Sequence, residues 1–237
     1  MKKSLITLLM LVITMANAQQ KNIIKTNLTA YSFRNVNLTY ERALAKWFSV
    51  SVGYANMGKG DIPMKSLIPA DAKDDFQDIQ IGNSSFTLET RFYVGKQGYG
   101  KGFYIAPYYR NTNFKTDNFT YELDANGQTI PVKISGNAKG NSAGLLIGAQ
   151  WFLGKKKNWA LDWWILGAHY GSGKGDFRGN SSRPLTADEQ AILKSELEGL
   201  DIPLVEYTTK VDANGASINL DGPWAGLRSG LSFGYRF

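Results

Sequence analysis

Cysteine is absent from the 237-residue sequence, and histidine occurs once, as His169. Without cysteine the chain has no disulfide, no thiolate metal ligand and no thiol nucleophile. The sequence also contains no glycine-rich phosphate loop and no zinc-binding motif. We therefore expect no cofactor and no metal site.

Long hydrophobic runs are absent as well, except at the N-terminus. There, the positive Met1–Lys3 precedes an apolar stretch over Leu5–Met15 and the small-x-small pattern Ala16-Asn17-Ala18. This predicts a secretory signal peptide over residues 1–18, cleaved to leave a mature chain of residues 19–237. The apolar stretch is shorter than the roughly 20 residues of a membrane-spanning helix. No cysteine lies at the cleavage site, so a lipid-anchored form is excluded.

Charge of one sign does not dominate the chain. There are 27 Lys and Arg against 20 Asp and Glu, and loss of Lys2 and Lys3 with the signal peptide leaves a formal charge of +5. The surplus is dispersed, and its dense patch Lys155-Lys156-Lys157 falls in a predicted turn. Nucleic-acid binding needs basic residues clustered on one face, so we expect no nucleic-acid partner.

What the sequence does contain is aromatic residues and glycine: 12 Tyr, 12 Phe, 6 Trp and 25 Gly. Many of the aromatic residues lie in stretches where apolar and polar side chains alternate. Over residues 85–94 the even-numbered positions are apolar apart from a threonine, and the odd-numbered positions carry Glu89 and Arg91. Such alternation predicts a strand with one apolar and one polar face.

Eight segments show this alternation, and each is near the roughly 9–11 residues that a tilted strand needs to cross a bilayer. They are residues 22–32, 35–44, 48–54, 86–94, 103–112, 143–151, 159–165 and 224–237. The connections sort by length. Short turns follow the second, fourth and sixth segments, at Ala45-Lys46, Gly95–Gly102 and Gly154–Asn158. Long polar stretches follow the third, fifth and seventh, at residues 58–83, 114–140 and 171–223.

The sorting of turn lengths is typical of outer-membrane barrels, which keep one side short and the other long. Only the first outer connection, around Phe33-Arg34, is tight. The sequence therefore predicts an all-β fold, an eight-stranded antiparallel up-and-down transmembrane β-barrel with long outer loops and periplasmic termini. A soluble lipocalin-like barrel is the rival fold, but it would turn its large apolar side chains inward.

The C-terminal strand ends in apolar residues at alternate positions, namely Leu231, Phe233, Tyr235 and Phe237. This pattern resembles the terminal strand signal of outer-membrane barrels. Lys25–Leu28 and Asn37–Glu41 resemble a Bacteroidota-type outer-membrane barrel family of unknown function. The resemblance implies location in the cell outer membrane, contact with outer-membrane lipid and insertion by the barrel-assembly machinery. It also implies a long final outer loop with a short helix, and it brings no catalytic residues.

The same alternation predicts that a set of charged side chains faces the interior of the barrel: Lys25, Glu41, Glu89, Arg91, Arg110, Asp162, Arg228 and Arg236. Eight strands leave a space just wide enough for side chains, and buried charges are tolerated when they are paired. We predict a structural network of salt bridges and hydrogen bonds that fills the interior. A transport path or an acid–base site is the alternative.

The final long loop carries a helix signal. Thr186 can cap a helix and Glu189 follows three residues later, as in a capping box. Apolar residues then recur at helical spacing up to Gly199, which can end the helix: Ile192, Leu193 and Leu197, with Leu200 just beyond. We expect an amphipathic helix near residues 186–199 that packs on neighbouring loop strands as a lid. A partner-binding or membrane-surface helix is the alternative.

Two loop segments repeat an Asp-x-Asn-Gly pattern, at Asp124–Gly127 and Asp212–Gly215. A calcium loop needs a further acidic ligand and a closing Glu, which both copies lack. Asn and Gly tolerate positive φ, so both segments predict hairpin tips. An acidic set in the first long loop predicts a solvated face, with a weak cation site as the alternative: Asp71, Asp74, Asp75 and Asp78.

Three function classes follow. A monomeric barrel with a structural or surface-interaction role, acting through its outer loops on an unidentified surface ligand, is favoured. A small-molecule binding or permeation barrel is the first alternative, and a rim enzyme acting on lipid is the second. His169 lies near the outer end of the seventh segment, but no Ser-His-Asp spacing accompanies it. We therefore expect no enzyme.

Overall fold

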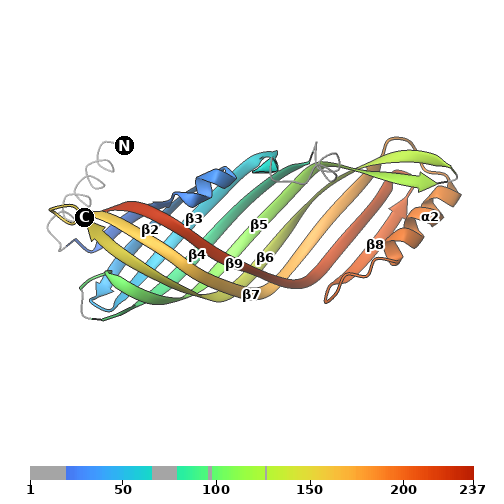
Figure 1. Cartoon of the computed structure of the whole chain (residues 1–237). Helices are drawn as coiled ribbons and strands as arrows, with labels where there is room; N and C mark the ends of the chain where they lie inside the picture. Colours follow the sequence, from blue (N-terminus) through green and yellow to red (C-terminus); the bar gives the residue numbers. More distant parts are fainter. Residues whose placement is uncertain (1–19, 66–78, 96–97, 126) are drawn as a thin grey trace, which may run out of the picture.

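The computed structural model in Figure 1 describes residues 20–65, 79–95, 98–125 and 127–237. The predicted signal peptide and the acidic set of the first long loop lie outside these residues. The chain forms one antiparallel sheet, in which the 3-10 helix η1 (Thr29–Phe33) and the helix α2 (Ala187–Glu198) are inserted. Its strands are β1 (Asn22–Asn27), β2 (Asn35–Ala45), β3 (Phe48–Asp61), β4 (Gln80–Val94), β5 (Gly102–Ala125), β6 (Gln128–Leu153), β7 (Trp159–Ser181), β8 (Glu206–Asp212) and β9 (Gly215–Arg236).

Strand pairing follows chain order from β1 to β7, after which β7 pairs with β9 and β9 pairs with β1. The last pairing runs from Ile23↔Arg236 to Asn27↔Ser232, so the paired strands return to their start as a ring. The predicted all-β, antiparallel up-and-down sheet is confirmed. Eight strands, β1–β7 and β9, form the ring, and a ninth strand that was not predicted, β8 (Glu206–Asp212), pairs with β9 inside the stretch that was expected to be a loop.

The strands are very unequal in length, from 6 residues in β1 to 26 in β6. The predictions of long loops over residues 114–140 and much of residues 171–223 are therefore wrong. The β5–β6 hairpin extends to Ala125↔Gln128 with one register shift between Thr116 and Phe119, and β7 pairs with β9 as far as Asn180↔Gly215. These polar stretches stay extended because each backbone bonds to its neighbour, and both predicted hairpin tips join paired strands.

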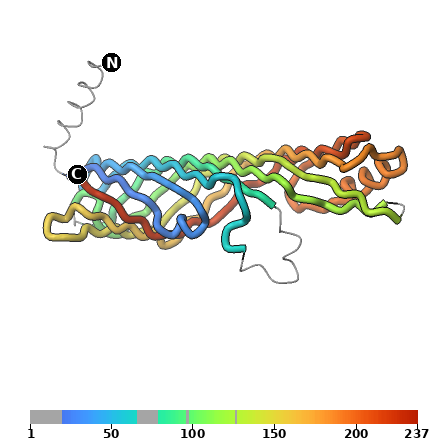
Figure 2. Tube along the Cα trace, turned by 90° about the horizontal axis from the view of Figure 1, so that it is seen from above, coloured from blue at the N-terminus to red at the C-terminus, as the bar shows by residue number. Residues whose placement is uncertain are grey.

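The first segment ends earlier than its alternation predicts. β1 stops at Asn27, and η1 follows, ending at Arg34 in the left-handed conformation with φ of 54°. β9 runs on past β1, so within the described chain its residues 222–230 have no strand partner on that side. The ring is therefore complete only at the end that holds the C-terminus and the short turns. Beyond it, β5–β9 project as an open curved sheet (Figure 2).

The two faces of the ring have opposite chemistry. Every ring strand presents large apolar side chains outward, for example Ile24, Leu38, Val52, Leu88, Ile105, Ile147, Trp163 and Leu227. The inner face carries buried polar side chains, among them Lys25, Glu41, Ser51, Glu89, Arg91, Gln150, Asp162 and Ser232. Soluble proteins bury apolar residues and expose charged ones, so this ring has the reverse arrangement.

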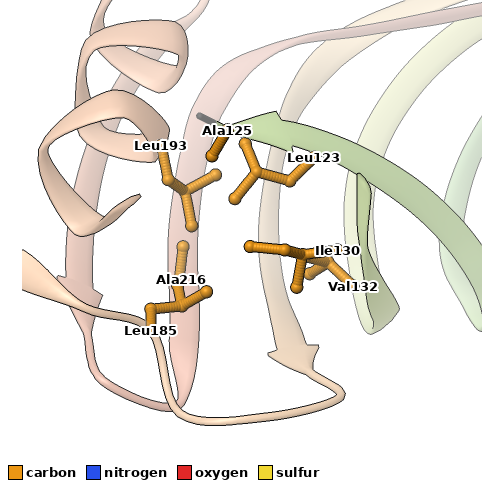
Figure 3. Packing of buried hydrophobic residues seen from close by; sticks show 7 residues of the cluster. All are labelled: Leu123, Ala125, Ile130, Val132, Leu185, Leu193 and Ala216. Carbon is orange, nitrogen blue, oxygen red and sulfur yellow. The ribbon is translucent and has the colours of Figure 1, made fainter. Parts of the chain in front are cut away.

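At the far end, α2 covers the projecting sheet through a small apolar core (Figure 3). The core comprises Leu123, Ala125, Ile130, Val132, Leu185, Leu193 and Ala216. The capping box is confirmed: Glu189 N donates to Thr186 Oγ1 and Thr186 N donates to Glu189 Oε2, at 3.4 and 2.8 Å. Gly199 caps the other end, and the lid interpretation holds because Leu193 is buried against the strands. No helix in the described residues is long and apolar enough to cross a membrane.

Acid is expected to loosen α2. The Arg183 guanidinium and the Thr186 backbone hydrogen bond lower the pKa of Glu189 from 4.5 to about 2. A carboxylate with a lowered pKa makes its full contribution to the stability of the folded form when the pH is above the pKa of the unfolded chain. This contribution disappears as the pH falls from 4.5 towards 2. A spin label on Lys194→Cys should gain mobility across that window. In a Glu189→Gln background the label should already be mobile at neutral pH, and a label equally immobile in both proteins at every pH would contradict this role.

Candidate functional site

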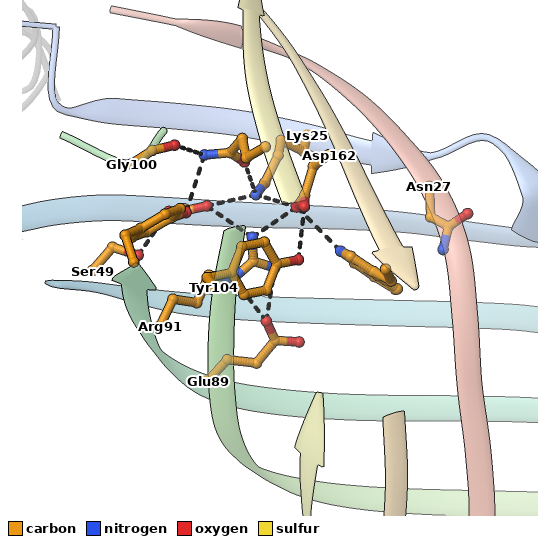
Figure 4. Close-up of polar contacts among 12 residues, drawn as sticks. Lys25, Asn27, Ser49, Glu89, Arg91, Gly100, Tyr104 and Asp162 are labelled. Atoms are coloured by element: carbon orange, nitrogen blue, oxygen red, sulfur yellow. Dashed lines mark hydrogen bonds and ion pairs between the residues drawn. The ribbon is translucent and has the colours of Figure 1, made fainter. Parts of the chain in front are cut away.

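Five ring strands, β1, β2, β4, β7 and β9, bring charged side chains together inside the ring, and Figure 4 shows part of this group near the short-turn end. Lys25 of β1 lies at the centre and donates from Nζ to Glu41 Oε2 at 2.5 Å, Asp162 Oδ2 at 2.6 Å and Gln150 Oε1 at 2.7 Å. Lys25, Glu41 and Asp162 are completely buried at their side chains. An ammonium group has three protons to donate, and each of them has an acceptor here.

Arg91 of β4 links the same acids to a third one. Its Nη1 donates to Asp162 Oδ2 at 2.7 Å and to Glu41 Oε2 at 3.2 Å, while Nε and Nη2 donate to Glu89 Oε2 at 3.0 and 2.8 Å. Glu89 Oε1 accepts a further bond of 2.9 Å from Arg228 Nη2. We call Lys25, Glu41, Glu89, Arg91, Asp162 and Arg228 the charge network. The alternation rule explains their shared face, since side chains two apart point to the same side of a strand.

Neutral side chains complete the charge network. Tyr104 OH donates to Asp162 Oδ1 at 2.7 Å and Tyr93 OH donates to Glu41 Oε1 at 2.6 Å. Ser49 and Trp164 donate to the same two acids, at 2.7 and 3.1 Å. The sequence analysis missed these residues and Gln150, although each has the inward parity of its strand. Buried carboxylates need several hydrogen-bond donors to offset their lost hydration. This requirement could have pointed to the inward-facing hydroxyl and indole groups on the strands around Glu41 and Asp162.

A polar cavity of about 210 Å³ lies next to the charge network, on the side away from the short turns. Its inner-face lining includes Asn37, Thr39, Ser51, Thr87, Arg110, Arg228 and one acid, Glu89. The two carboxylate oxygens of Glu89 are bound by Arg91 and Arg228. Arg110 shares the predicted inward parity but joins no ion pair in the described chain. Its Nε donates to Thr112 Oγ1 at 3.3 Å and its Nη2 donates to Ser85 Oγ at 3.0 Å. The structure thus brings six of the predicted charged residues together and leaves Arg110 apart.

Arg236, the eighth predicted interior charge, lies at the short-turn mouth of the ring. Its Nη1 donates to Gln20 Oε1 at 3.1 Å, and its guanidinium lies 4.2 Å from the centre of the Phe152 ring. It touches none of the acids of the charge network in the described residues. In the described residues, the contacts of the Arg236 guanidinium are thus with neutral groups.

Residues 4–176 match a family described as protein of unknown function (DUF3575). The chain belongs to this family. No curated protein matches the chain. Among solved structures, it is similar to a major outer membrane protein from Thermus thermophilus, with 14% identity, a TM-score of 0.44 and coverage of 92% of this chain and 99% of that one. It is also similar to Acinetobacter baumannii CarO, with 12% identity, a TM-score of 0.37 and coverage of 86% and 97%.

In this DUF3575 member the C-terminal segment closes the ring. Phe237 and Asn22 exchange two backbone hydrogen bonds, of 3.0 and 2.9 Å. Outside the ring, Trp159 stacks on Phe233 and meets Tyr235 edge-on, with ring centres 5.3 and 5.4 Å apart. The predicted assembly signal therefore lies on the strand that joins the two ends of the sheet, where its aromatic side chains cluster.

His169 lies on the inner face of β7, with its ring 6.1 Å from that of Tyr108 in an edge-on contact. Within residues 20–65, 79–95, 98–125 and 127–237, no group of three or more His, Asp and Glu side chains is arranged to hold a metal ion. In this family member the candidate site is therefore the charge network with its adjoining polar cavity.

Proposed function

We propose that the chain is a β-barrel of the outer membrane with a structural or surface-interaction role, and that its projecting outer half presents the interacting surface. The observation that carries this proposal is the reversed ring, with an apolar outer face on every strand and buried charges inside. Only strands in a closed ring satisfy all backbone groups in lipid. An apolar exterior and a polar interior are what such a ring needs there.

The dimensions of the apolar face support a membrane span. Strands β2 and β4 have 11 and 15 residues, and a tilted strand crosses the hydrocarbon layer with about 9–11. Exposed aromatic side chains lie towards both edges of the face: Trp47, Trp159 and Tyr235 near the short turns, and Tyr54, Tyr109 and Tyr170 towards the far end. Aromatic girdles of this kind lie at both membrane interfaces of barrels.

The filled interior supports a structural role over permeation. Lys25, Glu41, Arg91 and Asp162 are buried at the level where the ring is complete, together with the tyrosines that bind the two acids. An eight-stranded ring has no room for a channel beside them. The projecting strands and α2 lie beyond the outer girdle, so they face the cell exterior in this orientation. Outer-membrane lipid and the barrel-assembly machinery are the partners that this proposal requires.

Small-molecule binding is the second candidate, and a specific observation favours it. Besides the polar cavity, an apolar pocket of about 240 Å³ lies between α2 and the projecting sheet. Leu193 and Leu197 of α2 line it together with Phe177 and Ile218 of the strands. Binding pockets are concave and largely apolar with a few polar groups, and this pocket has that composition.

Fractionation tests the proposed function. We expect the mature chain to sediment with outer membranes, to resist urea extraction, and to migrate faster on gels before heating than after. Folded barrels keep their compact form in detergent because every strand is paired, which gives the mobility difference. Recovery of the chain as a soluble periplasmic protein after osmotic shock would end the proposal.

A further inference from the structure

The interior of the ring holds more cationic than anionic side chains. The cations are Lys25, Arg91, Arg110 and Arg228, and the acids are Glu41, Glu89 and Asp162. Each acid already pairs with two cations. Glu41 and Asp162 each pair with Lys25 and Arg91, and Glu89 pairs with Arg91 and Arg228. The described interior therefore carries one positive charge without a counter-charge, and this charge lies on the cavity side of the network.

Arg110 is the cation left over. Its two hydrogen bonds go to the neutral hydroxyls of Thr112 and Ser85, and Nη1 donates to no group in the described chain. The side chain lines the polar cavity. A guanidinium group removed from bulk water needs a compensating partner, and hydroxyl groups offset less of that cost than an anion does.

Arg228 reaches the same cavity from the opposite strand, β9, and is only 8% exposed. Its Nη2 is bound to Glu89, while Nε and Nη1 are buried and have no hydrogen-bond partner among the described residues. The guanidinium lies 4.5 Å from the centre of the Tyr108 ring and 4.7 Å from that of Trp164, so it is held in place by two aromatic faces. Tyr108 OH, buried beside it, also has no partner in the described chain.

We propose that the polar cavity binds the phosphate group of a small ligand between Arg110 and Arg228. Guanidinium groups present planar pairs of donors that match phosphate oxygens, and such charge-assisted bonds are stronger than neutral ones. The cavity offers about 210 Å³, whereas one water needs only about 10–15 Å³ of such space. The hydroxyls of Ser51 and Thr87 in the lining provide further donors.

The route into the cavity admits two sources of phosphate. Ala30 of η1 and Leu227 of β9 are part of the lining, at the level where β9 has no strand partner on the β1 side within the described chain. A free phosphate can enter from the open far side of the ring. A lipid headgroup can enter through this gap in the wall, and that source alone rests on the proposed membrane location.

Thermal unfolding of the full mature chain in nanodiscs tests the site. Inorganic phosphate, added at constant ionic strength against chloride, should raise the Tm of the parent protein. Arg110→Gln should weaken the apparent Kd for phosphate about tenfold or more, the loss expected for one strong charge-assisted bond. Arg178→Gln is the matched control, because Arg178 pairs with Asp212 on the exposed sheet and lies outside the cavity.

Arg110→Gln removes no ion pair, so this variant is expected to fold with a Tm no lower than the parent in chloride. A second arm compares phosphatidylcholine nanodiscs with and without phosphatidic acid. A Tm rise with phosphatidic acid alone assigns the site to a lipid headgroup, and a rise with inorganic phosphate assigns it to a free phosphate. The proposal is overturned if neither probe raises the Tm of the parent protein, or if the parent and Arg110→Gln respond alike. A soluble chain that still binds phosphate through Arg110 would overturn only the proposed membrane function.

Discussion

Replacing Asp162 with asparagine is expected to destabilise the folded chain by about 3–5 kcal/mol, the loss seen when one partner of a buried ion pair is removed. Asp162 accepts hydrogen bonds from Lys25, Arg91, Tyr104 and Trp164 at 2.6 to 3.1 Å. The asparagine keeps the shape of the side chain, so the loss reports the missing charge. Lys25 and Arg91, both completely buried, then share fewer anions.

Urea titration of the protein in lipid vesicles measures this loss. The protein folds into the vesicles at low urea and unfolds out of them at high urea, so the transition reports the free energy of unfolding of the membrane-inserted form. Asp221→Asn is the matched control. Asp221 pairs with Lys174 at 3.0 Å, and both side chains are more than half exposed, so the expected loss is about 0–1 kcal/mol. Steady ion conductance of the parent protein in planar bilayers, together with undiminished stability of Asp162→Asn, would show that the charges line a pore and would refute the filled interior.

Removal of Phe237 is expected to abolish most insertion into the outer membrane. The deletion takes away both backbone hydrogen bonds between Phe237 and Asn22, at the seam where β9 meets β1. Unpaired backbone groups at an open edge are not tolerated in lipid, and the last residue of the proposed assembly signal is lost with them. Phe237→Asp should have a similar effect, since it places a charge at the same terminal position.

Quantitative immunoblotting of purified outer membranes measures the effect, with Phe237→Tyr as the control that keeps an aromatic ring. The deletion should leave a small fraction of the parent level, and Phe237→Tyr should stay close to it. Normal levels of the deletion variant would show that the terminal residue is not needed for assembly, and the assignment of the signal to Leu231, Phe233, Tyr235 and Phe237 would be wrong.

The alternation of side chains predicted which residues face the interior because a pleated strand leaves each side chain no other choice. Lys25, Glu41, Arg91 and Asp162 were placed on the inner face by this argument, and all four are buried there. Strand length was harder to predict. Around Lys115 and Asp117 both parities are polar, so the pattern matches that of a loop, although β5 pairs with β6 on both sides of the register shift between Thr116 and Phe119.

Parity gives the face of a strand but not the height of a residue in the ring. Arg110 and Arg91 have the same orientation, yet Arg91 meets three acids and Arg110 meets none in the described chain. The difference comes from register: Arg110 lies opposite Thr87 and Ser142, next to the hydroxyl-lined cavity. Register depends on turn geometry and on packing across the ring, and neither can be predicted from one sequence with this precision.

Labelling of single cysteines in intact cells tests most directly whether the ring spans the outer membrane with its projecting half outside. The chain has no cysteine of its own, so Lys194→Cys on α2 and Lys156→Cys in the turn before β7 each report a single position. Both residues are exposed in the structure. With a membrane-impermeant maleimide, we predict labelling of Lys194→Cys in intact cells and of Lys156→Cys only after the outer membrane is permeabilised. Labelling of both positions in intact cells, of neither, or of Lys156→Cys alone would contradict a membrane-spanning ring in this orientation.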